Sequence, residues 1–433
     1  MEREKILRWA ALAGALLGPL TAAYATNGYS PTGFGTANKG LAGAGVALPQ
    51  DTLAGATNPA GMVYIGNRLD LGAALFAPDR GFTADDNAGS PPAKPGDPSS
   101  VPPGTYDSRN DFFLIPHFGW NRQIDESSSI GVLLGANGGM NTDYDDAVWR
   151  NFNNQAGTAS APTGVDFSQL FLGLPYARKL SERHAVGIMP IVAVQRFKAY
   201  GLEPFRALSV APDKLTNNGY DYSWGYGLRI GWLGQLTDRL TVGASAQSRL
   251  YMSEFDDYAG LFAEQGDFDV PPTVAVGLSF EVTPDVTLVA DLQRIFYGEV
   301  KALSNPNIAP GPGALLGADD GLGFGWEDIN ILKLGVQWRY SPKLTLRAGF
   351  SHADQLFENG EALFNVLAPA TVRTHASLGL SYSLDRSSVI SFAYTRAFNE
   401  KIDGQNLAFT GPQTGSVQMD QDELEVSWGW RFD

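Results

Sequence analysis

From Arg68 to the end of the chain, apolar and polar side chains alternate with a period of two. The stretch VTLVADLQRIFY, residues 286–297, places Val286 and Leu288 on one face and Thr287 and Asp291 on the other. The same alternation occurs in ILKLGVQWRY, VRTHASLGLSYSL and ELEVSWGWRF. A period of two sends successive side chains to opposite faces of an extended strand, so these stretches predict β-strands with one apolar face.

Fourteen such segments follow one another, and the connections between them alternate in length. The predicted strands start near Arg68, Phe112, Ser128, Val165, His184, Tyr222, Leu240, Thr273, Val286, Ile329, Leu344, Thr371, Ser388 and Gln418. Short polar turns such as SER and TPD alternate strictly with long connections such as 77–111 and 298–328. Tight turns at one end and long loops at the other are typical of an outer-membrane barrel. We therefore predict an all-β fold, a 14-stranded antiparallel transmembrane β-barrel over residues 66–433.

A soluble β-sandwich is the alternative, because it also alternates and also has turns. Its outward face would be polar, and its loops would not sort by length. Here the apolar face carries aromatic residues near strand ends, as a girdle at the membrane interface does: Phe296, Trp338, Tyr340, Trp428, Trp430 and Phe432. These residues favour the membrane barrel.

The first residues, MEREKILRWAALAGALLGPLTAAYA, have basic side chains before a short apolar stretch and end on Ala23-Tyr24-Ala25. This pattern predicts a secretory signal peptide, residues 1–25, cleaved after Ala25. An uncleaved anchor is the alternative, but the apolar stretch falls short of the roughly 20 residues needed to span a bilayer. The expected location is the outer membrane of a Gram-negative bacterium.

The composition excludes several kinds of chemistry. The chain has no Cys and a formal net charge of −15, which excludes thiolate sites and argues against binding nucleic acid. His375 and Ser377 share the polar face of one predicted strand, but no triad context surrounds them. We therefore expect no enzyme activity, no catalytic residues, no bound metal and no cofactor.

Residues 26–65 precede the first strand and are rich in glycine and almost free of charge. A barrel of fourteen strands is wider than its own side chains can fill. Glycine permits backbone conformations that other residues resist, which suits compact folding in a confined space. We interpret this segment as an N-terminal plug in the lumen; a disordered periplasmic tail is the alternative.

The tract GVALPQDTLAGATNPAGMVYIGN, residues 45–67, and the fourteen strands resemble the FadL family (OmpP1/FadL/TodX) of outer-membrane transporters for long-chain fatty acids and other hydrophobic compounds. The resemblance implies that residues 26–65 are a movable hatch with the motif Asn58, Pro59 and Ala60. It also implies sideways release into the bilayer at a kink in the third strand, SIGVLLGANGGMN. The residues that would form this kink are Gly135, Asn137, Gly138 and Gly139. An ordinary β-bulge is the alternative reading of these glycines.

The resemblance further suggests basic residues that would meet a fatty-acid carboxylate. The candidates are Arg196, Lys198 and Lys333, although Arg196 and Lys198 share a face with Val192 and Val194 and would need a bulge or the rim to turn inward. An uncharged hydrocarbon also remains open as the substrate. We expect a monomer in contact with outer-membrane lipid and lipopolysaccharide, and no nucleic acid partner. A general hydrophilic porin is the alternative function.

Overall fold

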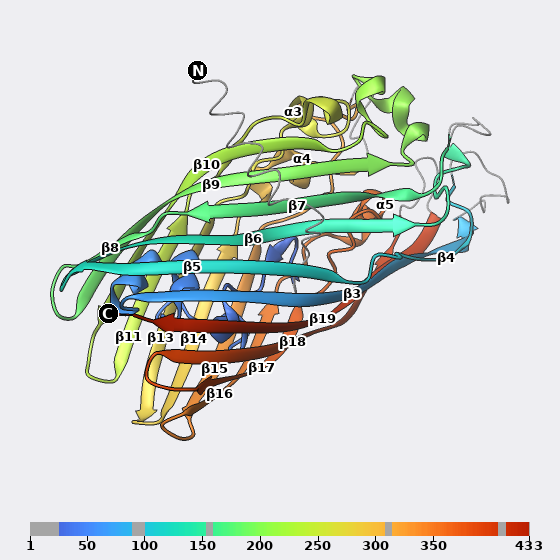
Figure 1. Ribbon diagram of the computed structural model, residues 1–433. Coiled ribbons are helices and arrows are strands. Elements are labelled where there is room, and N and C mark those ends of the chain that lie inside the picture. Colours follow the sequence, from blue (N-terminus) through green and yellow to red (C-terminus); the bar gives the residue numbers. More distant parts are fainter. Residues whose placement is uncertain (1–25, 89–99, 153–158, 308–313, 406–412, 433) are drawn as a thin grey trace, which may run out of the picture.

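The computed structural model describes residues 26–88, 100–152, 159–307, 314–405 and 413–432 (Figure 1). In these residues, seventeen strands pair antiparallel in one closed barrel. β4, β8 and β12 are short pieces in line with β5, β7 and β11, so the wall has fourteen strands, as predicted. The barrel closes where β19 pairs with β3. The expected signal peptide, residues 1–25, lies outside the described residues.

The strands vary in length, and the two longest, β3 and β19, pair with each other at the closure. Their bounds are β3 (Arg68–Ala88), β4 (Gly104–Asp107), β5 (Phe113–Asp125), β6 (Ser128–Tyr144), β7 (Thr163–Gly173), β8 (Tyr176–Lys179), β9 (His184–Tyr200), β10 (Asp221–Gln235), β11 (Leu240–Gln247), β12 (Tyr251–Met252), β13 (Thr273–Thr283), β14 (Val286–Ile295), β15 (Ile329–Arg339), β16 (Leu344–Ala353), β17 (Thr374–Ser383), β18 (Ser388–Gly404) and β19 (Gln413–Arg431).

The register sorts side chains between the two faces of the wall. Between β14 and β15, Leu292 lies opposite Leu332 and Asp291 opposite Lys333. The two leucines are 52% and 46% exposed, whereas Asp291 and Lys333 are 3% and 5% exposed. The apolar positions therefore face outward and the polar positions face the lumen, which is the arrangement that lipid around a barrel requires.

Short turns lie at one end of the barrel, here called the turn end, and long connections lie at the other, the loop end (Figure 1). One expected connection is largely strand: β3 continues to Ala88 and β4 lies within residues 77–111. The extension forms because β19 also continues, so that Gln421 pairs with Pro78 and Ser416 with Thr83. A neighbouring strand thus holds a segment that its Pro and Gly content marks as a loop.

The helices are short and lie in the lumen or in the connections at the loop end. They are α2 (Thr36–Lys39), η1 (Thr52–Ala56), η2 (Pro59–Tyr64), η4 (Glu203–Leu208), η5 (Pro212–Lys214), η6 (Asp256–Tyr258), α3 (Ala263–Gly266), η7 (Tyr297–Glu299), α4 (Lys301–Ser304), η8 (Asn359–Glu361) and α5 (Ala362–Asn365). Among the residues described, no helix has the length and apolar character to cross a membrane.

Residues 26–65, here called the lumenal segment, pass inside the barrel (Figure 1). The segment contains β1 (Thr26–Asn27), β2 (Ser30–Pro31), α2, η1 and η2, and nearly all of its residues are buried. Tyr64 alone in the segment is classed as exposed, at 44%. The lumenal segment packs against the inward-facing side chains and the backbone of the wall.

Candidate functional site: the filled lumen

The Asn58-Pro59-Ala60 motif begins η2 and joins the lumenal segment to the wall. Asn58 Oδ1 accepts a hydrogen bond from the Ala60 amide at 3.1 Å, the arrangement of an N-cap, and Pro59 occupies the first turn, where its missing N–H costs nothing. Asn58 Nδ2 donates to the carbonyl of Val46 at 2.9 Å and to that of Trp232 in β10 at 3.0 Å. One side chain therefore starts a helix, links two parts of the segment and reaches the barrel wall.

Glycines in the wall let the segment's backbone come this close. A Cβ added at Gly231 would lie 2.0 Å from Asn58 Oδ1, and one at Gly187 would lie 2.3 Å from the carbonyl carbon of Pro59. A Cβ at Gly243 would lie 2.6 Å from the carbonyl oxygen of Val46. Real Cβ atoms do not approach other atoms so closely, so any larger residue would push the segment away. We call Gly187, Gly231, Gly243 and Gly349 the wall glycines; Gly349 has the same relation to Leu41, at 2.1 Å.

A buried ion cluster fastens α2 to β19. Lys39 Nζ pairs with Glu423 and, at 2.7 Å, with Glu425 Oε2. The other oxygen of Glu425 accepts from Thr36 Oγ1 at 2.8 Å and lies 3.6 Å from Nδ1 of His117. The three charged side chains are between 1% and 4% exposed. Buried charges persist only when paired and hydrogen-bonded, so this cluster ties segment and wall together.

Asp291 and Lys333 hold the middle of the segment from β14 and β15. Asp291 Oδ2 accepts from the backbone amides of Gly45 at 2.6 Å and Val46 at 3.0 Å. Lys333 Nζ donates to the carbonyl of Thr32 at 2.7 Å. Lys333 faces the lumen, as expected, but its contact in the structure is with the lumenal segment.

The turn end of the segment is attached through β3. Asp70 Oδ2 accepts from the amide of Thr52 at 3.0 Å and from its hydroxyl at 2.8 Å. Arg68 pairs with Asp70 at 2.7 Å and donates to the carbonyl of Gln50 at 3.1 Å. Fastenings therefore run around the lumen from β3 through β10, β14 and β15 to β19.

Arg196 and Lys198 keep the outward parity of β9, in line with Val192 and Val194. Arg196 stands opposite Ser168 and Tyr222, in pairings of β9 that show no register shift. Both cations lie over the ring of Tyr220, at 4.8 and 4.7 Å from its centroid, and Arg196 is buried, at 5% exposed. No bulge turns the two residues inward, and their role in substrate binding stays a prediction.

The third barrel strand, β6, is irregular at the predicted glycines, and the irregularity has the form of a β-bulge. Its pairing with β7 shifts register between Ala136 and Gly138, which leaves Asn137 as the extra residue of a bulge. Gly138 has φ of +145°, and a Cβ there would lie 2.0 Å from the carbonyl oxygen of Tyr29 in the lumenal segment. Asn137 Nδ2 donates to Gln169 Oε1 at 2.6 Å. The bulge therefore touches the segment directly.

Pairing on the other side of β6 stops at the same level. The ladder between β5 and β6 ends at His117↔Gly135, so residues 113–116 and 136–139 are not paired with each other in the described strands. Residues 113–116 pair instead with β3, and residues 136 and 138–144 pair with β7. Contact between the two sides resumes at the backbone hydrogen bond from Arg109 to Asp143, at 3.0 Å. We call residues 113–116 and 136–139 the unpaired stretch.

An apolar cluster lines the unpaired stretch, formed by Ala74, Phe76, Phe113, Ile115 and Ala136. Gly135, at the last paired position, has room for a Cβ, whose nearest neighbour would be His117 Cβ at 3.9 Å. Of the four predicted kink residues, Asn137 and Gly138 therefore form the bulge, Gly139 follows it, and Gly135 is an ordinary wall position.

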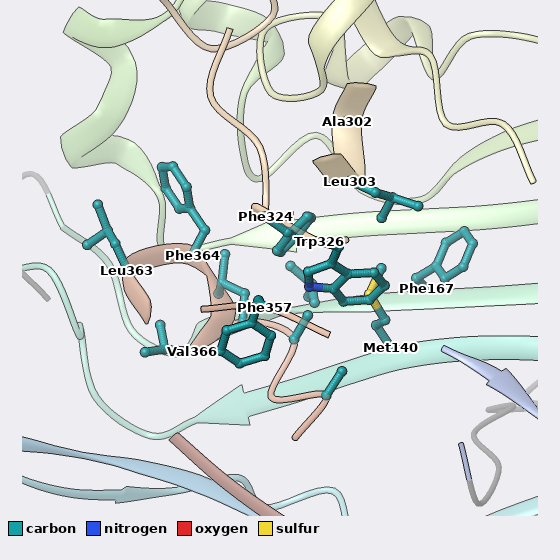
Figure 2. Packing of buried hydrophobic residues seen from close by; sticks show 14 of the residues in the cluster. Met140, Phe167, Ala302, Leu303, Phe324, Trp326, Phe357, Leu363, Phe364 and Val366 are labelled. Carbon is teal, nitrogen blue, oxygen red and sulfur yellow. The ribbon is translucent and has the colours of Figure 1, made fainter. Parts of the chain in front are cut away.

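A larger apolar cluster fills the lumen above the segment, toward the loop end. Figure 2 shows Trp326 next to Met140, with Phe167 on one side of it and Phe324 and Phe364 on the other. Tyr29 of the lumenal segment joins this cluster: its ring centroid lies 5.7 Å from those of Phe167 and Tyr297 and 6.1 Å from that of Trp326. An apolar cavity of about 30 Å³ within it is lined by residues such as Phe197, Phe262, Phe324 and Phe364. Aromatic side chains thus run from the loops down to the lumenal segment.

The pattern of apolar and polar residues alone does not reveal the wall glycines or the partners of the lumenal segment. Gly349, Asp291, Glu423 and Glu425 all occupy lumen-facing positions of the alternation, where polar residues had been interpreted only as the wetted wall. Small and acidic residues at inward positions, facing a long uncharged segment, were the available signal.

A closed barrel with an apolar exterior and a lumen filled by its own N-terminal segment is a plugged outer-membrane channel. The family model described as outer membrane protein transport protein (OMPP1/FadL/TodX) matches residues 15–423. The chain belongs to this family.

Three solved structures illustrate the shared fold. A Pseudomonas aeruginosa FadL homologue is 16% identical, with a TM-score of 0.70 over 94% of this chain and 100% of the other. The toluene transporter TodX of P. putida is 17% identical, with a TM-score of 0.66 over 93% and 99%. The toluene transporter TbuX of Ralstonia pickettii is also 17% identical, with a TM-score of 0.65 over 93% and 99%. A search of curated proteins finds no match.

Proposed function

We propose that this protein takes up hydrophobic molecules, fatty acids or hydrocarbons, through the outer membrane. The molecule enters the apolar cluster at the loop end, the lumenal segment shifts as a hatch, and the molecule leaves sideways into the bilayer through the unpaired stretch between β5 and β6. The single observation that carries this proposal is the coincidence of three features at one level of the wall. These are the bulge at Asn137, the missing pairing opposite it, and the contact of Gly138 with Tyr29 of the segment.

The physical reason for sideways release is the solubility of the cargo. Apolar surface gains free energy by leaving water, at about 25 cal/mol per Å². A straight aqueous pore would return the molecule to water on the periplasmic side. The unpaired stretch is lined by apolar side chains, so a molecule that passes there stays in apolar surroundings.

A general porin is the competing function. The filled lumen favours a selective channel instead. The lumenal segment is buried and fastened to wall strands that include β3, β10, β14, β15 and β19. We further propose cleavage after Ala25, a monomeric channel, and contact of the aromatic outer surface with lipid and lipopolysaccharide.

The hatch is tested by deleting residues 40–60. We expect the barrel to fold but to leak ions in planar bilayers, and to lose selective uptake of labelled long-chain fatty acid or toluene by cells. Liposome swelling with small sugars measures porin activity in the same samples. Unchanged conductance and unchanged uptake in the deletion variant would remove the hatch, and rapid sugar entry through the wild-type protein would favour the porin.

The sideways route is tested at the bulge. Gly138→Val and Gly139→Val together should slow uptake while the barrel stays folded. A Cβ at position 138 would collide with the carbonyl oxygen of Tyr29, and valine does not easily adopt the positive φ that Gly138 has. Gly135→Ala is the matched control, since that position has open space. Uptake at the wild-type rate in the double variant would argue against exit beside β6.

A further inference from the structure

A cavity of about 350 Å³ lies at the turn end, between the β15–β16 turn, the β17–β18 turn and the last residues of β19. Three cations line it: Lys343 from the first turn, Arg386 from the second and Arg431 from β19. Ser383 and Val389, which pair across β17 and β18, form another part of the lining. The tight turns of outer-membrane barrels face the periplasm, so this cavity lies at the periplasmic rim.

The one acidic side chain in this lining is occupied within its own turn. Asp385 Oδ1 accepts from the amide of Ser387 at 2.7 Å, from its hydroxyl at 2.8 Å and from the amide of Ser388 at 2.8 Å. In the part of the chain that the structure describes, no carboxylate lies within 4.0 Å of the side-chain nitrogens of the three cations. The lining therefore carries three positive charges against one negative charge.

This excess of positive charge is not a general feature of the turn end. A second cavity there, of about 250 Å³, is lined by Arg183 and Arg239 together with Glu182, Asp238 and Glu281. Arg183 pairs with Asp238 at 2.8 Å, and acids outnumber bases, as they do in the whole chain. Three cations around one cavity repel one another, and an anion between them offsets that cost.

A phosphate group has the charge and the acceptors that this lining requires. A phosphate monoester carries about −1.5 to −2 charges at neutral pH and offers three strong acceptor oxygens. Arginine donates through a planar fork and lysine acts as a compact point charge, and both are common partners of phosphate. A volume of about 350 Å³ is in the range of small-molecule sites, so the group that carries the phosphate has room as well.

The cavity also adjoins the lipid-facing surface. Ser388, which lines it, accepts a hydrogen bond from Trp428 Nε1 at 2.6 Å. Trp428 and Trp430 stack on the outward face of β19, with ring centroids 6.4 Å apart. Such tryptophans mark the level of the lipid head groups. A lipid phosphate at this level lies beside the rim, and a soluble phosphate ester reaches the cavity from the mouth of the barrel.

We propose that the cavity bounded by Lys343, Arg386 and Arg431 is a binding site for the phosphate of a phosphate monoester. The ligand is a lipid with a terminal phosphate or a soluble phosphate ester, which share this chemistry. The two guanidinium groups bind the phosphate oxygens, and the lysine supplies the third positive charge. No residue of the lining belongs to the lumenal segment or to the unpaired stretch, so this inference goes beyond the proposed function and does not depend on it.

The test uses two pairs of probes that differ only in the phosphate. Native mass spectrometry of the purified protein in detergent measures binding of dioleoyl phosphatidic acid against dioleoylglycerol at about pH 7.5, where the monoester is mostly dianionic. Calorimetry on the same samples measures binding of glycerol 3-phosphate against glycerol. The variant is Lys343→Met with Arg386→Met. The matched control is Arg178→Met with Lys179→Met, which removes two cations from the turn end outside the cavity.

We expect the wild-type protein to bind phosphatidic acid about tenfold or more tightly than dioleoylglycerol, because each cation beside an anionic head group contributes roughly fivefold in affinity. Lys343→Met with Arg386→Met should lose this preference, and the control should keep it within about twofold. Phosphate-dependent binding of the lipid pair alone would identify a lipid head group as the ligand. Binding of glycerol 3-phosphate that requires the same two residues would identify a soluble ester.

Equal binding of the phosphorylated and unphosphorylated probes in both pairs would overturn the proposal. Equal losses in the variant and the control would also overturn it, because the cations would then act through the overall charge of the turn end. Lys343 and Arg386 are both exposed, so their replacement leaves the packing of the wall intact. Lys343→Arg with Arg386→Lys keeps both charges and should retain binding, and a loss in that variant equal to the loss in the methionine variant would contradict the assignment.

Discussion

Replacing Lys39 by Met should loosen the lumenal segment and raise the probability that the channel conducts ions. Lys39 Nζ reaches both Glu423 and Glu425 of β19, and all three side chains are buried. With the lysine removed, two neighbouring carboxylates remain buried without a cation. Thr36 still donates to Glu425, but it carries no charge.

The magnitude follows from the contacts that are lost. A hydrogen bond to a charged group contributes about 1.5–3 kcal/mol, and Lys39 makes two, while breaking a buried pair by removing one partner costs about 3–5 kcal/mol. Two such bonds give about 3–6 kcal/mol, so the two estimates agree on a loss of at least about 3 kcal/mol. If this free energy favours the seated segment, its loss raises the open population about 100-fold.

The assay is single-channel recording in planar bilayers, with the heat-modifiable mobility of the folded barrel as the check on folding. The matched control is Lys401→Met, because Lys401 of β18 and its ion partner Asp403 are both largely exposed, at 56% and 81%. Adding Glu423→Gln and Glu425→Gln to Lys39→Met should bring the open probability back toward the wild-type value, since no unpaired charge then remains buried. An open probability unchanged within about twofold in folded Lys39→Met would refute the reasoning, because it would mean that the ion cluster contributes nothing to closure.

Two further predictions concern a wall glycine and a loop carboxyl. Gly231→Val should displace Asn58 and destabilise the seated segment by about 1–3 kcal/mol. The expected result is faster proteolysis of the segment in detergent. Proteolysis at the wild-type rate would contradict the argument that a Cβ at position 231 lies too close, at 2.0 Å, to Asn58 Oδ1. In the connection between β12 and β13, burial and then the nearby charge of Asp269 raise the pKa of Asp267 to about 7, so the folded loop binds more protons than the unfolded chain and loses stability as pH rises from about 4 to about 7. The hydrogen-exchange protection of residues 253–272, taken relative to the intrinsic exchange rate at each pH, should therefore be greater at low pH, and Asp267→Asn should remove this difference. An equal slope in the variant would contradict the assignment.

The wall of the barrel was predictable because lipid imposes one rule on every strand. Leu292 and Leu332 face outward and Asp291 and Lys333 face inward, as the alternation predicted. The same rule, applied without exception, would have placed Arg196 outward with Val192 and Val194. The resemblance to a family of fatty-acid transporters favoured the lumen instead. The pairing of β9 shows no register shift at Arg196, as periodicity predicts, but the side chain is only 5% exposed because residues outside the strand cover it.

Residues whose role depends on what lies across the lumen were not predictable. Glu423 and Glu425 are separated from Lys39 by almost the whole chain, and no local pattern reports that contact. Residues 77–88 lay within an expected loop, because Pro78 and Gly81 argue locally against a strand. These residues form a strand because they pair with the long strand β19. This pairing depends on closure of the barrel and not on the local sequence of these residues.

The wall glycines also decide which part of the interior can move. At Leu41, Val46 and Pro59 the peptide backbone lies directly against glycines of the wall, which leaves this portion little room to tilt or slide. Residues 26–35 lie beside the bulge of β6, ahead of that contact. If sideways release takes place as proposed, a small rearrangement of residues 26–35 would suffice for it while the rest of the segment continues to block water. Such a channel would pass hydrophobic molecules without opening an aqueous path through the outer membrane.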